Sequence, residues 1–168
     1  RNARLLLNYT KTNMLKLEIN NNIEIIKHLS ERNINVVAHI GVTPQSYTDF
    51  SKIKAVGKKN NERNKLIELA LEYEKAGAKI IVLECIFQKT AQEITTLVQI
   101  PTIGIGSSKF CDGQVLVFDD LININNDQKY PKFVKNYLNF NKLAKQAIKN
   151  FNQDVKKRKF PSKKYSYN

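Results

Sequence analysis

A single carboxylate, Glu84, stands near the C-terminal end of an unbroken apolar run, IIVLECI at residues 80–86. Such a run is typical of a strand buried on both faces. A carboxylate buried there lowers the stability of the fold unless it is paired with a charge or hydrogen-bonded, so an unpaired one suggests a role in catalysis. Barrels of parallel strands place their chemistry at that end of a strand. We therefore predict that Glu84 is a general base whose pKa is adjusted by apolar surroundings. A structural carboxylate bound to a buried partner is the alternative.

Three further side chains could serve the same chemistry. Lys16 and Glu18 are two residues apart on an expected strand, so they share one face. The pair suits an oxyanion-binding lysine beside a carboxylate that binds a metal or its water, and a surface ion pair is the alternative. His39 ends an apolar strand, where a histidine either lines a pocket or has a purely structural role. The turn GIG at residues 104–106 is a weak signal, because it lacks the full dinucleotide-binding pattern.

The apolar pattern predicts the elements that would position these residues. Strands are predicted at residues 13–18, 35–40, 79–84, 102–105 and 113–117, and helices at residues 1–12, 22–33, 62–76, 89–98, 131–140 and 141–157. This alternation indicates an α/β fold with a parallel sheet. We expect Lys16, Glu18, His39 and Glu84 to meet at one rim, because each lies near the C-terminal end of its strand.

Length and charge set broad limits on function. The 168 residues predict one domain with a basic tail at residues 156–168, and the net charge of +13 invites a nucleic-acid interpretation. We discount that partner, because Lys, Asn and Ile are the residues that AT-rich codons supply. No apolar run approaches the roughly 20 residues that cross a membrane, so no membrane contact is expected. Cys85 and Cys111 lack metal-ligand spacing and are expected to be reduced thiols of a cytoplasmic protein.

Seven segments of the chain together resemble the ketopantoate hydroxymethyltransferase family. They occur in family order and with family-like spacing across nearly the whole chain, and HIGVTPQS, VLEC and CDGQVLV together are specific. The segments are MLKLE (14–18), HIGVTPQS (39–46), AGAKIIVLEC (76–85), IPTIGIG (100–106), CDGQVLV (111–117), PKFVKNY (131–137) and FPSKKYSY (160–167).

The resemblance implies an enzyme of a particular kind. The family is a metal-dependent (β/α)8 TIM barrel of the phosphoenolpyruvate/pyruvate type. It transfers a hydroxymethyl group from 5,10-methylenetetrahydrofolate to 3-methyl-2-oxobutanoate, giving 2-dehydropantoate in pantothenate (vitamin B5) biosynthesis. The resemblance begins at the fourth barrel strand, so we expect strands four to eight. It also implies Mg²⁺ as cofactor, a small 2-oxo acid and a folate as ligands, and a homo-oligomer, a decamer in the family.

Carried over residue by residue, the resemblance makes Glu84 the general base, Lys16 a ligand of the 2-oxo acid, Glu18 a carboxylate of the magnesium site and His39 a residue of the substrate pocket. The chain also departs from the family pattern. Family glycines are replaced by Ile19 and Asn20 and by Ser51 and Lys52, a family histidine appears as Asp119, and a family-like GIGAG reads GIGSS with Ser107 and Ser108.

Two alternatives to an enzyme stay open. The first is a non-catalytic remnant or assembly partner that keeps the barrel surface, and the second is a basic nucleic-acid-binding domain. Because five strands cannot close an eight-stranded barrel, we expect residues 1–168 alone to be inactive and poorly stable, with open sheet edges.

Overall fold

The computed structural model of the protein describes residues 1–18, 23–48, 52–124 and 130–167. The chain divides into two compact units. The first comprises Arg1–Val115 with Pro131–Phe133, and the second comprises Leu116–Tyr130 with Val134–Asn168. The single domain expected for residues 1–168 stays a prediction. Three of the family departures, Ile19, Asn20 and Ser51, lie outside the described residues.

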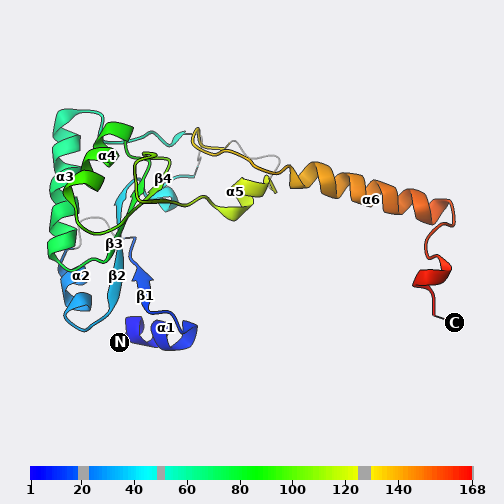
Figure 1. The fold of residues 1–168 in the computed structure, drawn as a ribbon, viewed down its shortest axis with the longest axis horizontal. Helices are drawn as coiled ribbons and strands as arrows, with labels where there is room; N and C mark the ends of the chain where they lie inside the picture. The colour runs from blue at the N-terminus through cyan, green and yellow to red at the C-terminus, as the bar shows by residue number, and fades with distance from the viewer. Residues whose placement is uncertain (19–22, 49–51, 125–129, 168) are drawn as a thin grey trace. The chain divides into compact units, whose positions relative to one another are not determined.

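A five-stranded sheet organises the first unit (Figure 1). The strands lie side by side in chain order, and every neighbouring pair is parallel. The α/β fold with a parallel sheet is therefore confirmed. The strands are β1 (Met14–Lys16), β2 (Asn35–Gly41), β3 (Ile80–Glu84), β4 (Thr102–Ile105) and β5 (Gly113–Gln114). The strand predicted at residues 113–117 is thus shorter than expected, and Val115 and Val117 beyond it are exposed.

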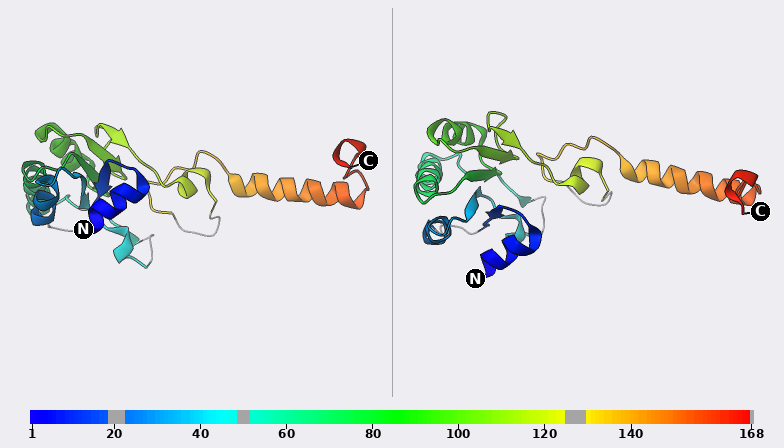
Figure 2. Two further views of the ribbon diagram at one scale, coloured as in Figure 1. Left: turned by 90° about the horizontal axis from the view of Figure 1, so that it is seen from below. Right: turned by 60° about the horizontal axis from the view of Figure 1, so that its bottom comes forward.

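Helices connect the first four strands and cover one face of the sheet (Figure 1; Figure 2). They are α2 (Ile23–Ser30), α3 (Asn60–Lys75) and α4 (Gln88–Leu97), preceded by α1 (Asn2–Thr10) beside β1. The core lies between these helices and the strands, where Tyr73, Ile81, Leu83 and Ile94 are almost completely buried. Each crossover returns the chain to the same end of the sheet, so all five strands end on the same side.

Side-chain alternation decides which residues face away from the helices. On β3, Ile81 and Leu83 belong to the core, so Glu84 lies on the opposite face. On β2, Ala38 and Ile40 are core residues, which puts His39 on the same face as Glu84. The register pairs residue 41, the last residue of β2, with Glu84, the last residue of β3. The side chains of His39 and Glu84 therefore both lie near the C-terminal end of the sheet.

The second unit contains α5 (Phe118–Ile122), α6 (Phe140–Lys156) and the short helix η3 (Lys163–Tyr165). The helix predicted at residues 141–157 is confirmed as α6. The helix predicted at residues 131–140 is wrong, because the N–H groups of Tyr137 and Leu138 donate to the carbonyl of Leu121 instead of to a preceding helical turn. Helix α5 was not predicted; its first turn carries Asp119 and Asp120, where negative charge favours a helix start.

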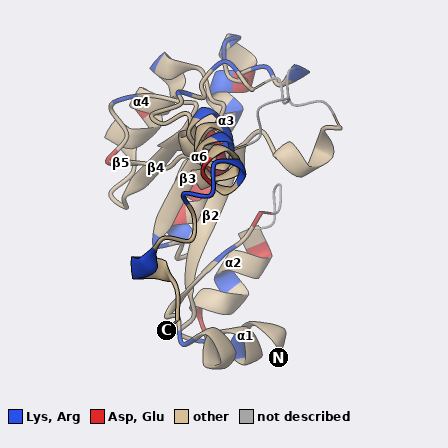
Figure 3. Ribbon diagram, turned by 90° about the vertical axis from the view of Figure 1, so that its right-hand side faces the viewer, with Lys and Arg blue, Asp and Glu red and all other residues tan. Residues whose placement is uncertain are grey.

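Helix α6 has no buried residue. Its N-terminus is capped by Asn139, whose side-chain oxygen accepts from the Lys142 N–H at 3.0 Å. The tail that follows this helix is rich in Lys and Arg, drawn in blue in Figure 3. The large apolar side chains of α6 are exposed, namely Phe140, Leu143, Ile148, Phe151 and Val155. Within the described residues, no helix combines the length and apolar character needed to cross a membrane.

Candidate active site

Glu84 is the last residue of β3, the central strand, and it is 8% exposed. Burial raises the pKa of its carboxyl group above the ordinary value of 4.5. The nearby positive charge of Lys16 opposes this rise in pKa, and the negative charge of Glu18 adds to it. The structure therefore places a carboxylate of increased basicity at the end of the sheet where the sequence predicts the site.

His39 is also buried, at 1% exposure. Its Nε2 lies 2.8 Å from the carbonyl oxygen of Val42, and since a carbonyl only accepts, Nε2 must carry the hydrogen. Burial is the largest effect on the pKa of this imidazole and lowers it, which favours the neutral ring. Nδ1 then presents a lone pair. Within the described part of the chain, this Nδ1 is buried without a hydrogen-bond partner, and it lies 4.0 Å from Oε2 of Glu84.

Lys16 and Glu18 form the ion pair that the alternative interpretation expected, with Nζ and Oε2 2.8 Å apart. Lys16 is exposed, whereas the Glu18 side chain is about one fifth exposed. The second carboxylate oxygen, Oε1, is buried and has no hydrogen-bond partner among the residues that the structure describes. An oxygen of this kind is what a hard cation such as Mg²⁺ prefers. The described residues contain no group of three His, Cys, Asp or Glu that could hold a metal.

The structure therefore brings the four predicted residues to one rim, Lys16, His39 and Glu84 from β1, β2 and β3 and Glu18 from the segment just after β1. Glu84 and His39 are 4.0 Å apart, and the charges of Lys16 and Glu18 act on the pKa of both. A base, a neutral imidazole, a cation and a carboxylate with a free oxygen suit chemistry in which a proton leaves carbon and negative charge develops beside it.

Ser107 supports this site in a way that sequence reasoning missed. Its hydroxyl donates to the carbonyl of Leu83 at 2.7 Å and accepts from the N–H of Ile86 at 3.2 Å. The two bonds span Glu84 and Cys85, which adopts a left-handed backbone with φ of 52°. The only signal in the sequence was a serine where the family pattern has a small residue after GIG.

Cys85 itself is buried and free. Burial raises the pKa of its thiol to about 11, with the charge of Glu84 as a second cause. The thiol therefore stays protonated at neutral pH and is not a nucleophile.

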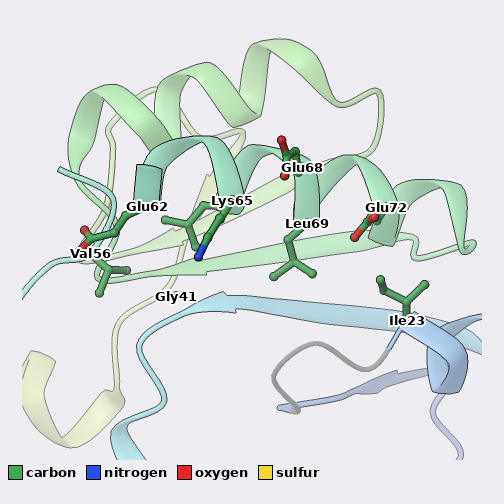
Figure 4. A pocket seen from close by; sticks show the side chains of 9 residues that line it. Ile23, Gly41, Val56, Glu62, Lys65, Glu68, Leu69 and Glu72 are labelled. Carbon is green, nitrogen blue, oxygen red and sulfur yellow. The ribbon is translucent and has the colours of Figure 1, made fainter. Parts of the chain in front are cut away.

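Two hollows border this end of the first unit. The first, of about 680 Å³, lies under α3, which contributes Glu62, Glu68 and Glu72 to its lining together with Lys65 (Figure 4). The second, of about 890 Å³, reaches Cys85 at the end of β3. Its lining comes from three segments that are distant in sequence, residues 53–55, 106–109 and 131–133, with Cys85, Gln88 and Gln114. We call it the basic pocket, because Lys54, Lys109 and Lys132 line it.

Comparison with known proteins agrees with the resemblance seen in the motifs. The family model described as ketopantoate hydroxymethyltransferase matches residues 1–163. Proteins named 3-methyl-2-oxobutanoate hydroxymethyltransferase are similar over most of the chain. The chain is 46% identical to the one from Pelagibacter ubique over 99% of its residues, 46% to that from Buchnera aphidicola subsp. Schizaphis graminum over 92%, and 44% to that from Thermotoga maritima over 86%. It spans 63%, 59% and 53% of these relatives' lengths.

Proposed function

The chain belongs to the ketopantoate hydroxymethyltransferase family, and on this premise we propose that the protein transfers a hydroxymethyl group from 5,10-methylenetetrahydrofolate to 3-methyl-2-oxobutanoate. The product is 2-dehydropantoate, in pantothenate biosynthesis. The observation that carries the proposal is Glu84, a buried carboxylate of raised pKa beside a neutral His39 at the end of the central strand.

We also propose that the five strands are strands four to eight of a (β/α)8 barrel. Three features support this assignment: the strands follow one another in chain order, all are parallel, and α2, α3 and α4 lie on one face. In such a barrel the other face would be the interior, and its C-terminal rim would hold the active site.

The reaction begins with loss of a proton from C3 of the 2-oxo acid. Glu84 takes that proton, and the electron pair of the broken C–H bond is delocalised onto the oxo oxygen as an enolate. The raised pKa makes Glu84 a stronger base than an exposed carboxylate, and the positive charge of Lys16 opposes part of this rise in pKa. Water hydrolyses the two C–N bonds of the folate's methylene bridge, which releases tetrahydrofolate and leaves the one-carbon unit as formaldehyde. C3 of the enolate adds to the carbonyl carbon of formaldehyde, and the alkoxide that forms takes back the proton held by Glu84 and becomes the hydroxymethyl group on C3.

The other three residues bind and orient the substrate. Lys16 would hold the negative charge of the 2-oxo acid, and His39, fixed by Val42, would line the pocket with Nδ1 turned toward Glu84. Glu18 would contribute its free Oε1 to Mg²⁺. A bound divalent metal would supply a Lewis acid for the oxo oxygen.

Product formation tests the proposal. The protein at its full encoded length, given Mg²⁺, methylenetetrahydrofolate and 3-methyl-2-oxobutanoate, should produce 2-dehydropantoate, detected by mass spectrometry. The variant Glu84→Gln should lose this activity. Glu68→Gln, which changes an exposed glutamate of α3 that is not among the four predicted site residues, is the matched control and should keep it. A protein that folds and binds the 2-oxo acid but forms no product would favour the alternative, a non-catalytic assembly partner.

We further propose that the protein is a homo-oligomer in the cytoplasm, with the decamer as the expected size. The exposed apolar side chains of α6 support assembly, because a helix with no buried residue leaves its apolar face without a partner. The two free cysteines, Cys85 and Cys111, suit a reducing compartment. Light scattering of the full-length protein tests the oligomeric size, and a monomer would contradict it.

A further inference from the structure

The basic pocket differs from the hollow under α3 in the charges of its lining residues. Lys54, Lys109 and Lys132 line it, and its lining, which lies wholly within the described residues, includes no Asp or Glu. The hollow under α3 has the opposite character, with three glutamates and one lysine. Both belong to the first unit, so an anion that reaches this end of the sheet is attracted to one hollow and repelled by the other.

The wall of the basic pocket includes an aromatic ring in a fixed place. A Cβ on Gly106 would lie only 2.6 Å from ring atoms of Phe133, and Gly106 has φ of +61°. A side chain at residue 106 would therefore displace the ring, and glycine lets residues 131–133 approach the end of β4. Phe133 is half-buried and lines the pocket together with the amide side chains of Gln88 and Gln114.

The pocket adjoins the candidate active site. Cys85 lines it and directly follows Glu84, and Ser107, another lining residue, bonds to the backbone on both sides of these two residues. A ligand in the pocket would therefore lie next to the strand end that carries the proposed base. At about 890 Å³ the pocket has the size of sites that hold ligands larger than a small 2-oxo acid.

We propose that the basic pocket binds the carboxylate-bearing tail of the folate co-substrate, with its lysines paired to glutamyl carboxylates and Phe133 packed against the aromatic ring to which the tail is attached. This inference rests on the proposed function, and it assigns the folate to a set of residues. A cation-rich lining, hydrogen-bonding amides and a half-buried ring match a ligand that joins several carboxylates to a flat aromatic body. Nζ of Lys109 lies 5.1 Å from the centroid of the Phe110 ring.

A binding comparison tests the assignment. The probes are tetrahydrofolate with one glutamate and tetrahydrofolate with five, titrated calorimetrically into the full-length protein. The protein should bind the pentaglutamate more tightly. The triple variant Lys54→Gln, Lys109→Gln and Lys132→Gln should weaken pentaglutamate binding by about tenfold, because each exposed charge pair contributes a few-fold. Its affinity for 3-methyl-2-oxobutanoate should not change.

The matched control removes the same charge elsewhere. Lys27→Gln, Lys65→Gln and Lys79→Gln also lower the net charge by three, and none of these residues lines the basic pocket. An equal loss of affinity in both triple variants, or equal binding of the two probes by the unchanged protein, would overturn the assignment. Failure of the unchanged protein to bind either folate would contradict the proposed function itself.

Discussion

The bridge made by Ser107 allows a quantitative prediction. In Ser107→Ala the bonds to the Leu83 carbonyl and the Ile86 N–H are both lost. A hydrogen bond of this kind contributes about 1 kcal/mol, and a buried N–H left without a partner costs about 1–3 kcal/mol. Ile86 is only 1% exposed, so water replaces the lost partner poorly. We expect the free energy of unfolding to fall by about 2–4 kcal/mol, measured by urea denaturation of the full-length protein.

The same substitution should affect the chemistry. The two lost bonds hold the backbone on both sides of Glu84, so the carboxylate would be less well placed, and a small misplacement of a catalytic group commonly lowers kcat by tenfold or more. We expect kcat to fall by about tenfold with little change in the KM for the 2-oxo acid, which Lys16 would bind.

Thr96→Ala is the matched control for Ser107→Ala. It also removes a hydroxyl that donates to a carbonyl, that of Gln92 at 3.0 Å, but at an exposed position on α4. We expect it to change the free energy of unfolding by less than about 0.5 kcal/mol. A Ser107→Ala protein as stable and as active as the unchanged one would refute the bridging role.

Three further substitutions test separate parts of the site. In Gly41→Ala the new Cβ would collide with the carbonyl oxygen of Glu84, and residue 41 has φ of +115°, which alanine rarely adopts. Urea denaturation should therefore show that the free energy of unfolding falls by about 3 kcal/mol. A fall of less than about 1 kcal/mol would contradict the close approach. Glu84→Gln should raise the melting temperature at pH 8 but not at pH 4. A raised folded-state pKa means that the carboxyl's contribution to stability is full below 4.5 and is lost as pH rises through the folded-state value; an equal effect at both pH values would contradict this. Glu18→Gln should weaken Mg²⁺ binding, followed by calorimetry, by at least about tenfold, and unchanged affinity would remove Glu18 from the metal site.

The sequence was informative where local pattern and chemistry coincide. An apolar run flanked by helical segments predicted β3, and the one carboxylate in it predicted the end of the sheet at which Glu84 stands. The positions of Lys16 and His39 followed from the same rule, because parallel strands joined by helices end on one side. The roles of these residues stay predictions.

The sequence was less informative where contacts between residues far apart in the chain determine the local structure. Residues 131–140 have helical spacing, yet Tyr137 and Leu138 bond to Leu121 and no helix forms. The bridge at Ser107 was invisible, since its partners lie 21 and 24 residues away. The basic pocket combines lysines from three separate segments, and the composition of the chain, rich in lysine throughout, does not distinguish them.

Exchange of the C3 hydrogen of 3-methyl-2-oxobutanoate for deuterium is the most direct test of Glu84 as the general base, because it isolates proton removal from the folate step. Proton NMR in deuterium oxide follows the loss of the C3 signal with the full-length protein and Mg²⁺. We predict that exchange in Glu84→Gln is slower by on the order of 10²–10⁴, with binding of the 2-oxo acid retained and Glu68→Gln at the rate of the unchanged protein. Near-normal exchange in a Glu84→Gln protein that binds the substrate would show that another group removes the proton.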